Sequence, residues 1–285
     1  MASLLGGAYL GFGILLTYTI SGFLGDCPAR HIIMGASFGV ALSLVIICGA
    51  EMFTGNAFVL YNGLRRKLIS IKDVLCLWAV CYGGNWLGAV ILSLLFYGAG
   101  YDTGTTAEAI TEAAVMKMSL PPLELFFRGI LCNILVCLAI WSSFRCHSDA
   151  GKLIMTFWCL YVFYTLGFEH CIANMTVMTL AMLLPAAPDI TLAGYGYNLF
   201  WVTLGNIAGA VFFLSKMVWQ TVIGERFSLL TTTENWQLGS VDNNNILYRK
   251  RGEKNYEKEN GNSIINSGNG NSNGSRMWQF IRFRK

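Results

Sequence analysis

Long apolar stretches alternate with short polar connections along most of this 285-residue chain. A helix needs about 20 predominantly apolar residues to cross a bilayer. Stretches of at least this length cover residues 2–24, 31–64, 73–98, 122–144, 153–184 and 194–223. We therefore expect an all-α membrane protein with six transmembrane helices. The second and fifth stretches are too long for one straight span, and we expect both of these helices to be broken.

Two short motifs each occur twice, in the same order. The first places a glutamate five residues before an asparagine, and the second reads Gly-Asn-x-x-Gly-Ala-Val. The copies lie at Glu51–Asn56 and Glu169–Asn174 for the first motif, and at 84–90 and 205–211 for the second. Duplication within an apolar chain is typical of transporters and channels built from two structural repeats. We interpret the second motif as a close-packing site whose Asn bridges between helices.

Charged residues divide the connections into two classes. Two connections are basic through Arg65, Arg66, Lys67, Lys72, Arg145 and Lys152, as is the region after the sixth stretch. The third-to-fourth and fifth-to-sixth loops instead carry Asp102, Glu108, Glu112 and Asp189. The positive-inside rule then places both termini in the cytoplasm, although Arg30 and His31 fall on the outer side. Three spans per repeat is an odd number, so the second repeat is expected to be inverted relative to the first.

The composition changes beyond the sixth stretch, where Asn, Ser and Gly replace the apolar residues. We divide the chain into a transmembrane channel bundle at 1–224 and a disordered, Asn-rich cytoplasmic tail at 225–285. The tail carries ten Lys/Arg and six Asp/Glu, which accounts for the whole formal net charge of +4. Its basic and aromatic end, 277–285, either contacts an anionic membrane surface or remains solvated.

Other functional classes find little support in the sequence. The nine cysteines show no metal-binding or disulfide spacing, and we expect them to pack as small apolar residues. No nucleophile–base set, metal cluster or nucleotide-binding loop is visible. We therefore expect no enzyme activity, no cofactor and no nucleic-acid partner. The first stretch lacks the basic start and cleavage site of a signal peptide.

The first motif predicts where the two long stretches break. Thr54, Gly55 and Asn174 are weak helix formers beside small residues, so each stretch should divide into two half-helices at Thr54-Gly55 and Ala173-Asn174. The N-terminus of each second half-helix would then carry partial positive charge into the membrane, where it favours an anion. We expect the two asparagines of the motif to satisfy the freed backbone groups. Glu51 and Glu169 are expected to form hydrogen bonds within their own breaks.

His170 breaks the symmetry between the two copies, because Met52 occupies its place in the first. It is the histidine predicted at mid-membrane, and a polar residue at that depth usually faces an interior path. We therefore expect His170 to line the path as a hydrogen-bond or proton donor. Lys117 precedes Pro121-Pro122 in a loop at the outer entry of the fourth span, and Asn133 is one of few polar residues within that span.

Several segments resemble the formate/nitrite transporter family, closest to its nitrite branch. They are 38–42, 48–56, 129–141, 168–175, 191–194 and 198–206, and the resemblance covers residues 1–223. It implies a homopentamer of aquaporin-like subunits in the cell's plasma (inner) membrane, each with its own pore for nitrite, formate or hydrosulfide. The family usually has an amphipathic helix before the first span, whereas here the first apolar stretch starts at residue 2.

The resemblance also implies roles for individual residues. His170 would be the central pore histidine, Thr54 its partner on the broken second span, Lys117 the vestibule lysine and Asn133 a polar residue beside the pore. The remaining pore candidates are Glu51, Glu169, Asn56 and Asn174. Apolar constrictions are expected at Phe38, Leu42, Met52, Phe53 and Phe163.

The sequence therefore predicts a proton-linked channel for nitrite and formate, with anions, protons, the lipid bilayer and further copies of the chain as its partners. Hydrosulfide as the main cargo is the alternative within the family. A water or glycerol channel is disfavoured, because it would need paired Asn-Pro-Ala motifs and here Ala57 and Met175 follow the two asparagines.

Overall fold

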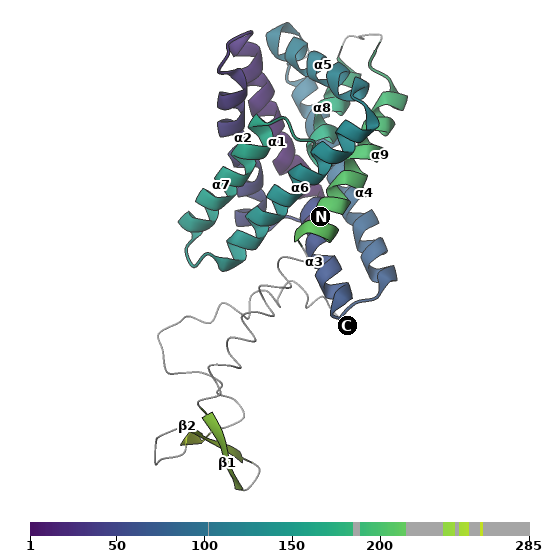
Figure 1. Cartoon of the computed structure of the whole chain (residues 1–285). Coiled ribbons are helices and arrows are strands. Elements are labelled where there is room, and N and C mark those ends of the chain that lie inside the picture. The colour runs from purple at the N-terminus through teal and green to yellow at the C-terminus, as the bar shows by residue number, and fades with distance from the viewer. Residues whose placement is uncertain (102, 185–188, 215–235, 243–244, 251–256, 259–285) are drawn as a thin grey trace. The chain divides into compact units, whose positions relative to one another are not determined.

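The computed structural model is almost entirely helical in its first 214 residues (Figure 1). It describes residues 1–101, 103–184, 189–214, 236–242, 245–250 and 257–258. The helices are α1 (Ala2–Leu24), α2 (Arg30–Cys48), α3 (Phe53–Arg65), α4 (Ile71–Gly98), α5 (Gly104–Ser119), α6 (Pro122–Arg145), α7 (Asp149–Thr165), α8 (Cys171–Leu183), α9 (Leu192–Ala208) and a π-helix, η1 (Gly209–Leu214).

Helix length and surface composition mark an integral membrane protein. Within the described residues, α1, α2, α4 and α6 are long and apolar enough to cross a membrane. Large apolar side chains also face outward, as Leu75, Val80 and Leu95 do on α4. A soluble monomer rarely exposes so large an apolar surface, whereas a bilayer solvates it.

The helices pack in the same order in the two halves of the bundle. Helix α1 packs against α2 and α4, and α6 packs in the same way against α7 and α9. Each short helix crosses to the other half, since α3 contacts α6 and α8 contacts α1. Helices α2 and α7 join the halves directly (Figure 1).

Helix α5 occupies most of the segment for which the sequence predicted a loop. Its Ala, Glu and Met residues favour a helix. Ala107, Ile110 and Ala114 are buried at helical spacing, where α5 packs against α1 and α8. Lys117 therefore lies in the last turn of a helix and not in a loop.

The two predicted breaks occur, but a few residues before the positions that the sequence indicated, because Thr54-Gly55 and Ala173-Asn174 lie in the first turns of α3 and α8. Stretch 31–64 divides into α2 and α3, and stretch 153–184 divides into α7 and α8. The chain leaves α2 and α7 through Gly49 and Gly167, whose φ angles of 71° and 68° lie in the left-handed region that favours glycine. One extended residue then precedes each second half-helix, Met52 before α3 and His170 before α8.

The backbone groups freed at the breaks are satisfied by the asparagines of the second motif. Asn85 Oδ1 accepts from the Phe53 N–H at 2.9 Å, and its Nδ2 donates to the carbonyls of Glu51 (2.9 Å) and Ser3 (2.6 Å). Asn206 repeats this arrangement in the second half. It accepts from the Cys171 N–H at 3.0 Å and donates to the carbonyls of Glu169 (2.9 Å) and Gly129 (2.8 Å).

Asn56 and Asn174 do not have the capping role that the sequence suggested. Their Nδ2 groups donate to the carboxylates of Glu51 at 2.7 Å and Glu169 at 2.6 Å. The reason is geometric, because five residues separate each Glu from its Asn and the new helix turns the two side chains toward each other. The glutamates thus form hydrogen bonds within their own breaks, as expected.

The glycines of the second motif allow the close approach that the sequence predicted. A Cβ at Gly88 of α4 would overlap the carbonyl oxygen of Leu4 in α1. In the second half, a Cβ at Gly205 of α9 would overlap the carbonyl oxygen of Phe126 in α6. Small residues at these crossings bring the backbones within reach of the bridging asparagines.

The chain divides into two compact units, Met1–Lys216 and Met217–Lys285. Within the second unit, β1 (Trp236–Asp242), β2 (Asn245–Lys250) and β3 (Glu257–Lys258) form an antiparallel sheet in the order β1-β2-β3. These strands lie in the segment 225–285, for which the sequence predicts disorder. The rest of that segment is outside the described residues.

We predict that Asn206→Ala destabilises the bundle. The change leaves one buried N–H and two buried carbonyls without their partner, each at a cost of about 1–3 kcal/mol. We expect the free energy of unfolding to fall by about 3 kcal/mol or more, measured by thermal unfolding of the purified protein. Asn62→Ala is the control, because within the described residues the Asn62 side chain forms a hydrogen bond only to the carbonyl of Phe58 in its own helix. Equal unfolding midpoints for the two variants would contradict this capping role.

Candidate functional site

His170 lies where the N-termini of two half-helices meet. Its Nδ1 accepts a hydrogen bond from the Ala173 N–H at 3.2 Å, so the imidazole caps α8. Its Nε2 lies 3.1 Å from Thr54 Oγ1, in the first turn of α3. Because Nδ1 is an acceptor, Nε2 carries the proton and donates to Thr54. Thr54 then keeps its own hydroxyl proton for another acceptor.

The surroundings of this pair favour negative charge. The first turns of α3 and α8 converge there, and each contributes the partial positive charge of a helix N-terminus. Asn133 of α6 forms hydrogen bonds with backbone carbonyls beside this pair. Its Nδ2 donates to the carbonyls of Thr54 at 3.3 Å and Asn206 at 2.6 Å, and its Oδ1 is buried without a hydrogen-bond partner in the described part of the chain.

A cavity of about 340 Å³ leads to His170 from the side of the bundle on which α5 lies. Its lining includes the titratable residues Arg30, His31, Glu112, Lys117, Arg128, Glu169 and His170. Phe163 and Ala173 also line it, whereas Thr54 is not among the lining residues. The imidazole of His170 therefore stands between the cavity and Thr54.

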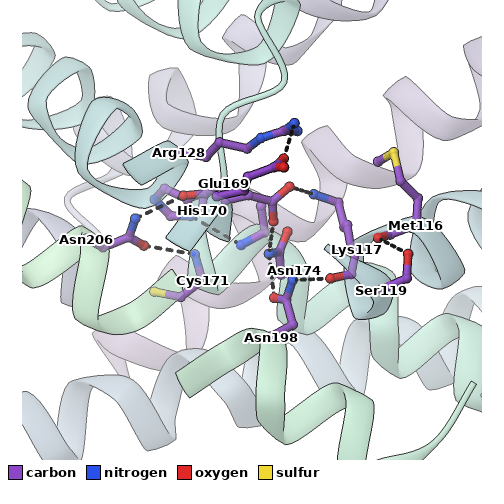
Figure 2. Close-up of polar contacts among 12 residues, drawn as sticks. Met116, Lys117, Ser119, Arg128, Glu169, His170, Cys171, Asn174, Asn198 and Asn206 are labelled. Atoms are coloured by element: carbon purple, nitrogen blue, oxygen red, sulfur yellow. Dashed lines mark hydrogen bonds and ion pairs between the residues drawn. The ribbon is translucent and has the colours of Figure 1, made fainter. Parts of the chain in front are cut away.

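Lys117 and Glu169 form an ion pair at the cavity wall. Lys117 Nζ lies 2.6 Å from Glu169 Oε1, and the two side chains are only 11% and 1% exposed (Figure 2). Asn174 donates to the other carboxylate oxygen and also to Asn198 Oδ1 at 2.9 Å. Asn198 Nδ2 donates to the Lys117 carbonyl at 2.8 Å, which closes the network. Lys117 is thus a largely buried, paired cation at the cavity wall rather than a solvent-exposed one.

The first half of the bundle has a simpler arrangement. Asn56 Nδ2 donates to Glu51 and lies 3.4 Å from Cys81 Sγ. No ion pair to Glu51 occurs among the residues that the structure describes. The structure therefore brings Glu51 and Asn56 together, but it does not place them in the cavity that leads to His170.

The predicted constriction residues fall into three groups. Phe163 adjoins the histidine, with its ring stacked on His170 at 6.1 Å, and Phe38 packs against Phe163 with the ring centroids 5.4 Å apart. Phe53 instead packs against Trp78 and Tyr82 of α4, at centroid distances of 5.8 and 5.0 Å. Leu42 and Met52 are both buried in the apolar core.

Sequence reasoning missed three polar contributors, Asn198, Arg128 and the capping role of Asn206. The Asn206 role had a signal in the repeated motif, but the motif does not name the backbone groups that it binds. Arg128 forms an ion pair with Glu124 at 3.1 Å, and its carbonyl accepts from the Glu169 N–H at 3.4 Å (Figure 2). Asn198 is an isolated polar residue in an apolar stretch, and nothing nearby in the sequence points to its partners.

Known proteins share this fold and much of this sequence. A family model described as formate/nitrite transporter matches residues 1–220. The nitrite transporter NirC of Escherichia coli (strain K12) is 42% identical over 214 residues, which cover 74% of this chain and 79% of that protein. A probable formate transporter of Methanothermobacter thermautotrophicus is 31% identical over 244 residues, covering 78% of this chain and 88% of the relative.

Solved structures agree with these relatives. An FNT family ion channel superimposes with a TM-score of 0.73 at 40% identity, covering 77% of this chain and 88% of that channel. A pentameric formate channel with formate bound gives a TM-score of 0.70 at 26% identity, covering 78% and 96%. The family model spans more than half of the chain and the helical bundle matches throughout, so this protein belongs to the formate/nitrite transporter family.

Proposed function

We propose that this protein is a channel for small monovalent anions, nitrite and formate, in which His170 links anion passage to a proton. The observation that carries the proposal is the position of the imidazole. It separates a charged cavity from Thr54, where two half-helix N-termini converge. The names of the relatives support the cargo, since one is a nitrite transporter and another is a channel with formate bound.

The proposed architecture is aquaporin-like, with six spans arranged as two inverted three-helix repeats. The matching order of helix contacts in the two halves supports the repeats. The basic connections support cytoplasmic termini, which would place the cavity at the outer surface of the plasma (inner) membrane. We further propose a homopentamer, on the strength of the pentameric formate channel to which the chain is similar.

In this proposal, an anion in the cavity meets a barrier at Phe38 and Phe163. Moving a bare charge past two aromatic rings is costly because the rings offer it no hydrogen bonds. The same anion becomes much less costly to move once it carries a proton. The buried Asn133 Oδ1 would then serve as an acceptor for the acid's O–H group.

His170 is suited to deliver that proton at Nδ1. Nδ1 takes a proton from water in the cavity while Nε2 keeps its bond to Thr54, and an anion in the cavity then takes the Nδ1 proton and passes as the acid, which returns the imidazole to its neutral form. Nδ1 gives up its bond to the Ala173 N–H in that step, and Ala173 lies on the cavity wall. One proton thus accompanies each anion. A liposome flux assay that compares nitrite, formate and hydrosulfide across pH tests the cargo and the linkage together.

We predict that His170→Asn lowers nitrite flux at least about tenfold and flattens its pH dependence. Asparagine is a good N-cap, so α8 should still form, but it has no imidazole nitrogen to carry a proton. Flux is measured in proteoliposomes between pH 5 and 8. His147→Asn, at an exposed position, is the control. An assembled His170→Asn protein with the original pH dependence would refute this role of His170.

We predict that Lys117→Ala reduces flux at both low and saturating nitrite. Its loss leaves the Glu169 carboxylate buried without a cation, and breaking a buried pair costs about 3–5 kcal/mol. The double variant Lys117→Met/Glu169→Gln should recover the unfolding midpoint but not the flux. Lys152→Ala removes an exposed pair and serves as the control. A defect confined to low nitrite would indicate instead that Lys117 acts by attracting anions from solution.

We predict that a chain ending at residue 231 still forms a conducting pentamer. The segment beyond it has too few apolar residues to offset the entropy of ordering, and the residues proposed for the pore all precede residue 224. Oligomer size and nitrite flux of the purified truncation are the measurements, with the full chain as reference. Loss of the pentamer would show that the tail belongs to the fold.

A further inference from the structure

One face of α1 forms a wall of the cavity above His170. Ile14, Tyr18 and Ser21 all line the cavity, and their spacing of four and three residues places them on the same side of the helix. Tyr18 is 7% exposed and Ser21 is 5% exposed. Two hydroxyl groups, each on a side chain more than nine-tenths buried, therefore lie along the route from the cavity mouth to the histidine.

Three other hydrogen-bond donors of the cavity are already committed to protein groups. Lys117 donates to Glu169, Arg128 donates to Glu124, and the Tyr164 hydroxyl donates to Thr17 Oγ1 at 2.9 Å. Each of these bonds would have to be exchanged before the donor could bind an ion.

The Ser21 and Tyr18 hydroxyls differ from these donors. The hydroxyls of Thr17 and Thr19 bond carbonyls of their own helix, but Ser21 Oγ has no hydrogen-bond partner among the described residues. The Tyr18 hydroxyl lies near that of Tyr164, whose own proton is donated to Thr17 Oγ1. An anion accepts a hydrogen bond more strongly than a neutral phenol does, so the Tyr18 hydroxyl would donate to it in preference.

The charge at the cavity mouth also favours an anion. Arg30 lines the cavity, and its Nη1 donates to the carbonyl of Gly25 at 3.2 Å. Within the described residues it forms no ion pair with a carboxylate. The other charges at the wall are Glu112, His31 and the paired Lys117, Glu169 and Arg128. Arg30 is thus the cation whose charge is least compensated.

We propose that Tyr18 and Ser21, below Arg30, form an anion-binding subsite that holds a small monovalent oxyanion before it reaches His170. The inference rests on the proposed channel function and adds a determinant of cargo choice. Nitrite and formate each present two oxygen acceptors, which suit two hydroxyl donors on one helix face. Hydrosulfide presents a sulfur, which is a weak acceptor, and it gains less from the same donors.

The test measures initial flux against substrate concentration in proteoliposomes of the full chain. The variants are Tyr18→Phe, Ser21→Ala and their combination, each of which removes one or both hydroxyls and keeps the packing. Tyr9→Phe is the matched control, because Tyr9 is on the same helix and partly buried but is not part of the cavity lining. Nitrite, formate and hydrosulfide are each compared, and oligomer size is checked for every variant.

We expect the half-saturating concentration of nitrite and formate to rise about threefold for each single variant and about tenfold for the pair. Hydrosulfide flux and the pH profile should match those of Tyr9→Phe. An unchanged half-saturating nitrite concentration would overturn the subsite, as would an equal loss for nitrite and hydrosulfide. If Tyr18→Phe fails to assemble, Ser21→Ala decides the question alone. Absence of anion flux in the unchanged chain would instead overturn the channel function, and the subsite with it.

Discussion

The arrangement of this protein depends on one requirement, that backbone groups freed inside an apolar bundle must find partners within the protein. Two helical stretches are interrupted inside the bundle, and at each interruption one asparagine forms hydrogen bonds with the freed backbone groups. Asn206 binds the carbonyl of Glu169 and the N–H of Cys171, which are the residues on either side of His170. The imidazole is therefore fixed by a clamp on its neighbours in the chain, and its own two nitrogens remain available for Ala173 and Thr54.

The two halves share this framework but differ in the chemistry they place on it. Asn85 clamps the neighbours of Met52 in the same way, yet a thioether offers no proton to relay. Asn133 donates to the Asn206 carbonyl, whereas in the first half Gly7 of α1 lies so close to the Asn85 carbonyl that a Cβ would overlap it. The same framework of hydrogen bonds thus occurs at both breaks, and the residues of the second half concentrate the polar groups around one of them.

Local sequence patterns predicted part of this arrangement. Stretch length predicted that two helices are broken, but the weak helix formers Thr54, Gly55 and Asn174 lie just after the breaks. The hydrogen bonds of Glu51 and Glu169 within their own breaks were predicted, whereas their asparagine partners were not. Partners distant in the chain were not predictable: Asn206 is 35 residues from Cys171, and Lys117 is 52 from Glu169. Such pairs depend on how helices pack, which hydrophobic periodicity does not specify. Helix α5 was not predicted, because its acidic residues and short buried face distinguish it from a membrane span, although its Ala, Glu and Met residues favour a helix.

In the proposed channel, the Lys117–Glu169 pair explains why a lysine at the cavity wall need not hold anions tightly. At 2.6 Å from a buried carboxylate, the ammonium group is largely neutralised, so an arriving anion must compete with Glu169 for it. A bare lysine in the same place would bind an anion strongly, and strong binding slows release toward the pore. Asn174 and Asn198 fix the carboxylate and the α5 backbone, so the balance between the charges is set by geometry. In the proposed channel, conduction would then depend on weak, successive contacts along the cavity, of which the proposed Tyr18–Ser21 subsite is one.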